Sequence, residues 1–174
     1  MTIQELIKLI EQWAIDRSLD KKGTVEGQLI KTAEEVAELI IGISKDDIDL
    51  IKDSVGDVFV TLVIGNMLTN LKVHPYGSSI AFEDMMKYYG VLQSKSISSK
   101  YNIIKRIVND FTSIMENNCY KVGISDLWMD LNGVCLMYNL LPIDCIESAY
   151  KEIAGRKGKV INGSFVKSED LKDE

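Results

Sequence analysis

Residues 28–67 constrain the fold most, because apolar side chains recur there at helical spacing along two consecutive segments. At about 100° per residue, one broad face of the first segment collects Leu29, Ile30, Ala33, Val36, Ala37, Ile40 and Ile41. The second segment contains the almost wholly apolar run 58–64, which is typical of a helix buried in a core. The pattern predicts two long helices that pack side by side at the centre of the protein.

Acidic side chains gather on the other face of the first segment and at the start of the second. The polar face of the first segment carries Gln28, Lys31, Glu34, Glu35 and Glu38. Asp53 and Asp57 lie one turn apart in the second segment, beside the apolar run, so we expect both near buried surface. Burial of carboxylates is costly unless they are paired, protonated or bound to a cation. Since only Lys31 and Lys52 lie nearby, the sequence indicates a hard divalent cation, Mg²⁺ or Mn²⁺.

Each of these residues also allows a simpler interpretation. The glutamates can be a solvated helix face, and Lys31 can pair with Glu35 at i,i+4, which stabilises a helix by a few tenths of a kcal/mol at most. Trp13 can be an ordinary core residue, and the basic run 156–159 can be solvated. The sequence pattern alone leaves these alternatives open.

Length and composition limit the class of protein. The 174 residues are enough for one domain with a sizeable core, which we place at 1–174. A net charge of −6 argues against nucleic acid as the main partner. The longest apolar run is too short to cross a bilayer and the N-terminus lacks signal-peptide features, so we expect a cytoplasmic protein without a membrane partner. Three widely spaced cysteines indicate free thiols rather than disulfides or a zinc site.

The apolar periodicity of the chain and its helix-capping and helix-breaking residues predict an all-α fold of about seven helices. They cover residues 3 to about 17–19, a segment capped by Thr24, about 45–71, 81–92, 101–116, 125–140 and 143–154. Residues 20–23 are expected to form a loop, Ser44 and Asp47 a capping box, and Ser125 an N-cap. Pro142 either ends one helix or opens the next. Asn162-Gly163 between short apolar runs predicts a β-hairpin in the tail.

One spacing occurs twice. Asp53, Asp57 and Asn66 have the same mutual spacing as a second set made of Asp126, Asp130 and Asn139, and each set leads into an apolar helix. An internal repeat and ordinary amphipathic patterning both produce this arrangement.

Several short motifs together resemble one family. Glu35-x-x-Glu38 follows Lys31 and Gln28, and Val55-Gly56-Asp57-Val58 follows in the second helix. The flanking matches are Trp13-Ala14-x-Asp16-Arg17-x-Leu19, Ile146-Glu147-Ser148-Ala149-Tyr150, Arg156-Lys157-Gly158-Lys159 and Asn162-Gly163-x-Phe165-Val166. The chain thus resembles the MazG-like all-α nucleoside triphosphate pyrophosphohydrolases, related to dimeric dUTPases and dCTP pyrophosphatases, and above all their short bacteriophage versions. Residues 73–123 are outside the resemblance and form an expected helical insertion, and about 158–174 form the tail.

The resemblance implies a MazG-like helical bundle that assembles as a homodimer or homotetramer. It also implies Mg²⁺-dependent hydrolysis of a nucleoside or deoxynucleoside triphosphate, a small-molecule partner, to monophosphate and pyrophosphate. The implied metal ligands are Glu35, Glu38 and Asp57, with Asp53 as a further candidate, and Glu34 binds through water or orients the nucleophile. The implied substrate-binding candidates are Gln28, Lys31, Lys151, Arg156 and Trp13.

The chain departs from the family pattern at two places. Ser54 stands where the family has a glutamate, and Asp53 lies one position earlier. Lys151 and Ala154 stand where members carry Asn and Lys as phosphate contacts. These departures leave two alternatives to an active enzyme: a catalytically weak relative that binds or sequesters nucleotides, and a helical protein that binds a partner.

Overall fold

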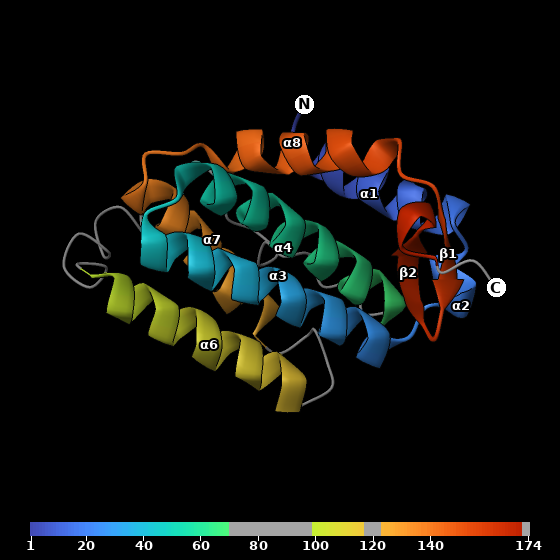
Figure 1. The fold of residues 1–174 in the computed structure, drawn as a ribbon, viewed down its shortest axis with the longest axis horizontal. Helices are drawn as coiled ribbons and strands as arrows, with labels where there is room; N and C mark the ends of the chain where they lie inside the picture. Colours follow the sequence, from blue (N-terminus) through green and yellow to red (C-terminus); the bar gives the residue numbers. More distant parts are fainter. Residues whose placement is uncertain (70–98, 117–122, 172–174) are drawn as a thin grey trace.

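The described residues form an all-α protein with one short β-hairpin, as expected from the periodicity (Figure 1). The computed structural model describes residues 1–69, 99–116 and 123–171. Its helices are α1 (Ile3–Asp16), α2 (Leu19–Lys22), α3 (Val25–Lys45), α4 (Ile48–Leu68), α6 (Lys100–Glu116), α7 (Ile124–Met137) and α8 (Pro142–Ala154). The strands are β1 (Gly158–Ile161) and β2 (Ser164–Lys167), followed by a 3₁₀ turn, η1 (Ser168–Asp170).

Helices α3 and α4 run antiparallel through the middle of the molecule, as the sequence predicts (Figure 1). Thr24 caps α3 by accepting a hydrogen bond from the Gly27 N–H, so the predicted cap is confirmed. Asp47 caps α4 by accepting from Leu50 N–H. The predicted capping box with Ser44 is wrong, because the Ser44 hydroxyl lies inside α3 and donates to the Ile41 carbonyl.

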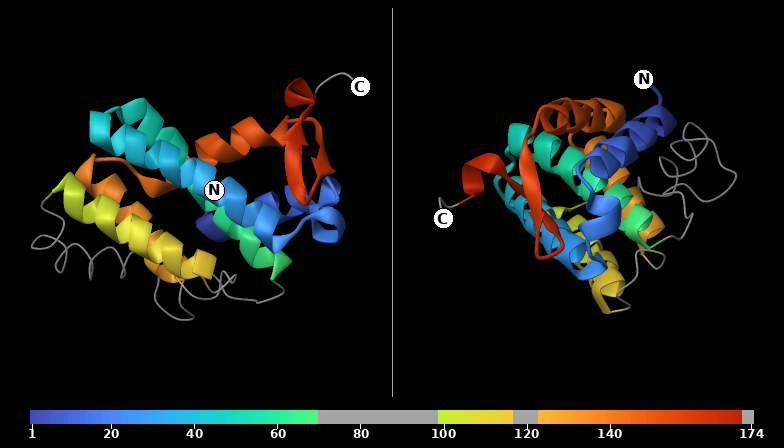
Figure 2. Two further views of the ribbon diagram at one scale, coloured as in Figure 1. Left: turned by 60° about the horizontal axis from the view of Figure 1, so that its bottom comes forward. Right: turned by 90° about the vertical axis from the view of Figure 1, so that its right-hand side faces the viewer.

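Helices α1 and α8 pack on α4 from the side opposite α6 (Figures 1 and 2). Pro142 occupies the first turn of α8 and thus opens that helix. Gly56 of α4 allows the close approach of α8, because a Cβ there would lie 2.4 Å from the Cys145 carbonyl oxygen and 2.7 Å from Ala149 Cβ. The contact brings the C-terminal half of α8 close to the aspartates of α4.

Helices α6 and α7 complete the bundle beside α3 and α4 (Figure 2). Phe59 of α4 and Trp128 of α7 meet at 4.7 Å between ring centroids, inside one continuous apolar core. The predicted cap at Ser125 is wrong, because α7 starts at Ile124 after Gly123, whose φ of 84° favours glycine. The helix also ends at Met137 rather than at 140.

The tail forms the predicted hairpin. β1 and β2 are antiparallel and pair Ile161 with Ser164 across a two-residue turn. Asn162 and Gly163 have φ values of 50° and 83°, which match a type I′ turn. The turn lies on the start of α3, where the Thr24 N–H donates to the Gly163 carbonyl at 3.0 Å. This contact holds β2 and η1 beside the α3–α4 pair.

The prediction of a single buried apolar face on α3 is only partly correct. Ile30 and Ile41 are 59% and 43% exposed, and Ala37 is exposed as well. Gln28, which was placed on the polar face, is buried. Neighbouring elements cover a narrower stripe of α3 than the apolar pattern suggested, so one edge of that pattern faces solvent. Residues 19–22, partly expected as a loop, instead form the short helix α2.

Some predictions fall outside the described residues, including the helix at 81–92, most of the insertion 73–123, and Cys119. Cys135 and Cys145 are buried free thiols, as expected. Within the ranges that the structure describes, no helix has the length and apolar character required to span a membrane.

Candidate active site

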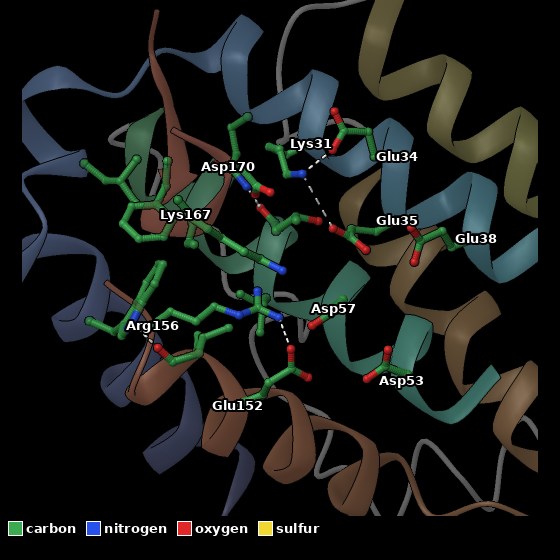
Figure 3. A pocket seen from close by; sticks show the side chains of 18 residues that line it. Lys31, Glu34, Glu35, Glu38, Asp53, Asp57, Glu152, Arg156, Lys167 and Asp170 are labelled. Atoms are coloured by element: carbon green, nitrogen blue, oxygen red, sulfur yellow. Dashed lines mark hydrogen bonds and ion pairs between the residues drawn. The ribbon is translucent and has the colours of Figure 1, made fainter. Parts of the chain in front are cut away.

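A pocket of about 300 Å³ lies between α3, α4, α8 and the C-terminal hairpin (Figure 3). Its acidic lining comes from Glu34, Glu35, Glu38, Asp53, Asp57, Glu152 and Asp170. Its basic lining comes from Lys31, Arg156 and Lys167. The remaining lining side chains are Trp13, Leu19, Gln28, Val60, Thr61, Ile64, Ile153 and Phe165. The pocket therefore combines a strongly charged wall with an apolar, partly aromatic one.

The acidic wall is short of positive charge. Burial, together with the charge of Asp57, raises the pKa of Glu35 from 4.5 to about 7, although Lys31 opposes the shift from 4.0 Å. Burial and the charge of Asp53 raise the pKa of Asp57 from 3.8 to about 6. Asp53 is exposed, contrary to the expectation of burial, and partial desolvation together with the charge of Glu152 raises the pKa of its carboxyl. Ionisation of these carboxyl groups is therefore unfavourable in the protein alone, and a bound cation would stabilise their charged forms.

Arg156 is the cation that faces the α4 aspartates. Its guanidinium pairs with Glu152 one turn earlier and extends toward Asp57 (Figure 3). Its charge opposes the rise in pKa of both Asp53 and Asp57. Lys167 of β2 projects into the same space (Figure 3). Arg156 and Lys167 therefore reach the pocket from the side opposite α3, where their charges can bind phosphate oxygens, although Glu152 pairs with Arg156 there.

A further arginine holds Arg156 in place. Arg17 donates from Nε and Nη2 to the Arg156 carbonyl oxygen, at 3.1 and 2.7 Å. Its guanidinium also stacks over the Trp13 ring at 4.5 Å. The Trp13 indole in turn donates to the Ile153 carbonyl at 2.6 Å and meets the edge of Phe165 at 5.1 Å. Trp13 is therefore both a core residue and part of the pocket wall.

The order of residues along α3 and α4 separates the two ends of the pocket. Gln28 precedes Glu35 by seven residues, about 10 Å along a helix, and Thr61 follows Asp57 by one turn. Gln28 donates from Nε2 to the Thr61 carbonyl at 3.3 Å. Because α3 and α4 are antiparallel, both residues lie on the same side of the carboxylates, toward Leu19 at the apolar end.

Most of the predicted site residues line this pocket. The structure brings together Gln28, Lys31, Glu34, Glu35, Glu38, Asp53, Asp57, Arg156 and Trp13. Lys151 is not among the lining side chains; its side chain is 70% exposed and pairs with Glu147 at 3.6 Å. Ser54, which stands where the family has a glutamate, is 1% exposed and does not line the pocket. The preceding residue, Asp53, lines it instead.

The sequence interpretation missed four groups at the pocket. Glu152, Lys167 and Asp170 come from α8 and the tail, and their position depends on long-range packing that no local pattern reports. The i,i+4 spacing of Glu152 and Arg156 was the available signal for the first of them. Phe165 belonged to a matched motif, yet nothing in the sequence showed that it lies against Trp13.

The second acidic set has a different environment. Asp130 of α7 is fully buried and forms an ion pair with Arg106 of α6 at 2.6 Å. Asp126 is exposed. Burial nevertheless raises the pKa of the Asp130 carboxyl to about 8, although Arg106 opposes the shift.

The donor atoms of the pocket fit a hard divalent cation in type. As the side chains stand in the described ranges, no three His, Cys, Asp or Glu residues converge closely enough to hold an ion. The acidic lining offers carboxylate oxygens, which Mg²⁺ and Mn²⁺ prefer. The half-buried Glu35 and Asp57, with their raised pKa values, also fit a cation-binding role.

The chain has a bacteriophage relative. Over 62 residues, it is 53% identical to an 18.2 kDa protein from the rep-hol intergenic region of Haemophilus phage HP1, which is described as uncharacterized. The match covers 36% of this chain and 38% of the phage protein. No protein-family pattern matches the chain. No solved structure matches it either.

Proposed function

We propose that this pocket binds a nucleoside or deoxynucleoside triphosphate with Mg²⁺ and hydrolyses it to the monophosphate and pyrophosphate, as in MazG-like enzymes. The observation that carries the proposal is the set of carboxylates on α3 and α4 that faces Arg156 and Lys167 across one cavity (Figure 3). A triphosphate matches this charge pattern, because its oxygens can bind a shared cation on one side and protein cations on the other.

Glu35, Glu38, Asp53 and Asp57 are the residues that would hold Mg²⁺, with Mn²⁺ as an alternative. When bound, such an ion polarises phosphoryl oxygens and lowers the pKa of a nearby water. Arg156 and Lys167 bind the phosphate chain and stabilise the charge that develops on it. In the hydrolysis, the water oxygen bonds to the α-phosphorus and its proton is released to solvent, while the bond to the α–β bridging oxygen breaks and pyrophosphate leaves.

Glu34 and Lys31 form an ion pair at the edge of the pocket. We assign Glu34 the role of orienting the attacking water, because its carboxylate lies next to Glu35 without being buried like it. Lys31 belongs on the phosphate side of the ligand, since it lies between the carboxylates and the apolar end of α3.

Asp53 replaces the missing family glutamate in this proposal. The pocket lining includes Asp53 and leaves out Ser54. Asp53→Ala should therefore lower Mg²⁺-dependent turnover at least about tenfold, and Asp53→Asn should do the same with less disturbance of packing. Ser54→Glu should raise turnover if the buried site accepts the carboxylate, and thermal unfolding shows whether that variant folds.

The proposal includes a homodimer or homotetramer. Ile30, Ala37 and Ile41 recur on one exposed stripe of α3, which is the kind of surface that a second copy can cover. Light scattering after size exclusion should give a mass of two or four chains, and Ile30→Glu should reduce it. A monomer at micromolar concentration would contradict this part of the proposal.

The direct test is pyrophosphate release from a panel of nucleoside and deoxynucleoside triphosphates with Mg²⁺. Wild type should release pyrophosphate from at least one of them, and Glu38→Ala should abolish the release. Glu11→Ala, which removes a glutamate of α1 away from the pocket lining, is the matched control and should retain the activity. Unchanged turnover in Glu38→Ala would show that the metal is elsewhere.

A nucleotide-binding protein without turnover is the second candidate. The specific observations that favour it are the absence of the usual glutamate at Ser54 and the position of Lys151 outside the pocket lining. Measurable nucleotide binding together with no pyrophosphate from any substrate would select this alternative.

A further inference from the structure

Gln28 is a polar side chain at the apolar end of the pocket, and the enzyme proposal gives it no chemical role. It is 4% exposed and lines the cavity, whose lining also includes Leu19, Trp13 and Ile64. A polar group in such a place must be hydrogen-bonded, because an unpaired one is costly. The Gln28 Nε2 meets this requirement by donating to the Thr61 carbonyl, whereas Oε1 needs a donor from elsewhere.

The Thr61 carbonyl fixes the orientation of the Gln28 amide. A backbone carbonyl only accepts hydrogen bonds, so the NH₂ group of Gln28 must face it, as the 3.3 Å bond shows. A flipped amide would set two oxygen acceptors against each other, which removes the usual ambiguity in assigning the two ends of a glutamine. The Gln28 backbone is held as well, because its carbonyl accepts a bond from the Thr32 hydroxyl at 2.9 Å.

The fixed orientation leaves the Gln28 oxygen as a hydrogen-bond acceptor toward the cavity. In the ranges 1–69, 99–116 and 123–171, the bonds of the Gln28 side chain include no donor to Oε1. The neighbouring Thr61 hydroxyl donates to the Val58 carbonyl at 2.8 Å, so its proton is already used within α4. The cavity lining includes aromatic and aliphatic side chains, which suit a flat ring.

We infer that Gln28 selects the base of the bound nucleotide by accepting a hydrogen bond from an exocyclic amino group, so that cytosine and adenine bases are preferred over their keto counterparts. The inference rests on the proposed function, since the phosphate chain must lie at the carboxylate end for the base to reach Gln28. A keto oxygen at the same ring position would meet the Gln28 oxygen and leave two acceptors unpaired. One net hydrogen bond corresponds to a preference of about three- to tenfold.

The test uses nucleotide pairs that differ only in that group. Equilibrium binding of CMP and UMP, and of AMP and IMP, is measured with Mg²⁺ by calorimetry, so that no turnover is needed. Wild type should bind the amino member about three- to tenfold more tightly in each pair. Gln28→Met keeps the volume of the side chain and should bring the ratio near one. Gln12→Met, on α1 outside the pocket lining, should keep the wild-type ratio.

The outcomes separate this inference from the enzyme proposal. Equal affinities within both pairs, tighter binding of the keto members, or an unchanged ratio in Gln28→Met would overturn the role of Gln28 even if pyrophosphate is released from triphosphates. Preference for amino bases without any pyrophosphate release would retain Gln28 as the selecting residue and refute the enzyme. No binding of any of the four nucleotides would overturn the inference outright.

Discussion

Replacing Glu35 by glutamine should stabilise the metal-free protein while abolishing the proposed Mg²⁺-dependent hydrolysis. In the folded protein the pKa of Glu35 is raised from 4.5 to about 7, chiefly by burial. At about 1.4 kcal/mol per pH unit, ionising it in the fold costs at most about 3.5 kcal/mol. The side chain is still 15% exposed, so solvent screening reduces this to roughly 1–2 kcal/mol. Glu35→Gln should therefore raise the Tm at pH 8 by about 3–6 °C.

The rise in Tm caused by Glu35→Gln should depend on pH. The folded state holds a proton that the unfolded chain releases above pH 4.5, so the Glu35 carboxyl destabilises the fold increasingly as the pH rises through about 7. The gain in Tm should therefore shrink to about a quarter at pH 5. Calorimetric scans at both pH values, with chelator present, measure it.

Glu34→Gln is the matched control for this experiment. Its side chain is 52% exposed, so its removal should change the free energy of unfolding by less than about 0.5 kcal/mol at either pH. Mg²⁺ should raise the Tm of wild type in a concentration-dependent way and should raise that of Glu35→Gln much less. A Glu35→Gln protein that is no more stable than wild type at pH 8, or is equally stabilised at both pH values, would refute the reasoning about burial and charge.

Three further substitutions test the packing that builds the site. Arg17→Ala should raise the KM for the triphosphate about three- to tenfold with a smaller change in kcat, because Arg17 holds the backbone of Arg156; steady-state kinetics measures this split. Burial raises the pKa of Asp130 to about 8, so its carboxyl lowers stability as the pH rises from 3.8 to about 8; Asp130→Asn should flatten that decline in urea unfolding at pH 5 and 8.5. Gly56→Ala should destabilise the protein by about 1–3 kcal/mol in the same assay, whereas Gly155→Ala, with open space around it, should not.

The parts of the fold that local chemistry determines were predictable from the sequence. Thr24 capped α3 and Asn162-Gly163 formed a hairpin turn, because both depend on neighbouring residues. The acidic side of α3 followed from helical spacing alone. Gln28 was misplaced because its burial depends on the carbonyl of Thr61, which lies 33 residues away.

The wall of the pocket formed by α8 and the C-terminal hairpin was not predictable either, because it depends on contacts between residues far apart in the sequence. Lys167 and Asp170 reach the pocket because the hairpin turn packs on the start of α3. Glu152 reaches it because Gly56 admits α8 close to α4. Helix periodicity reports which face of an element is apolar, and it carries no information about which distant element covers that face.

The most direct test of the central claim is pyrophosphate release measured side by side for wild type and Glu38→Ala, with and without Mg²⁺. Wild type should release pyrophosphate only when Mg²⁺ is present, and Glu38→Ala should release none under either condition. Absence of pyrophosphate from every nucleoside and deoxynucleoside triphosphate, or release that persists in Glu38→Ala, would contradict it.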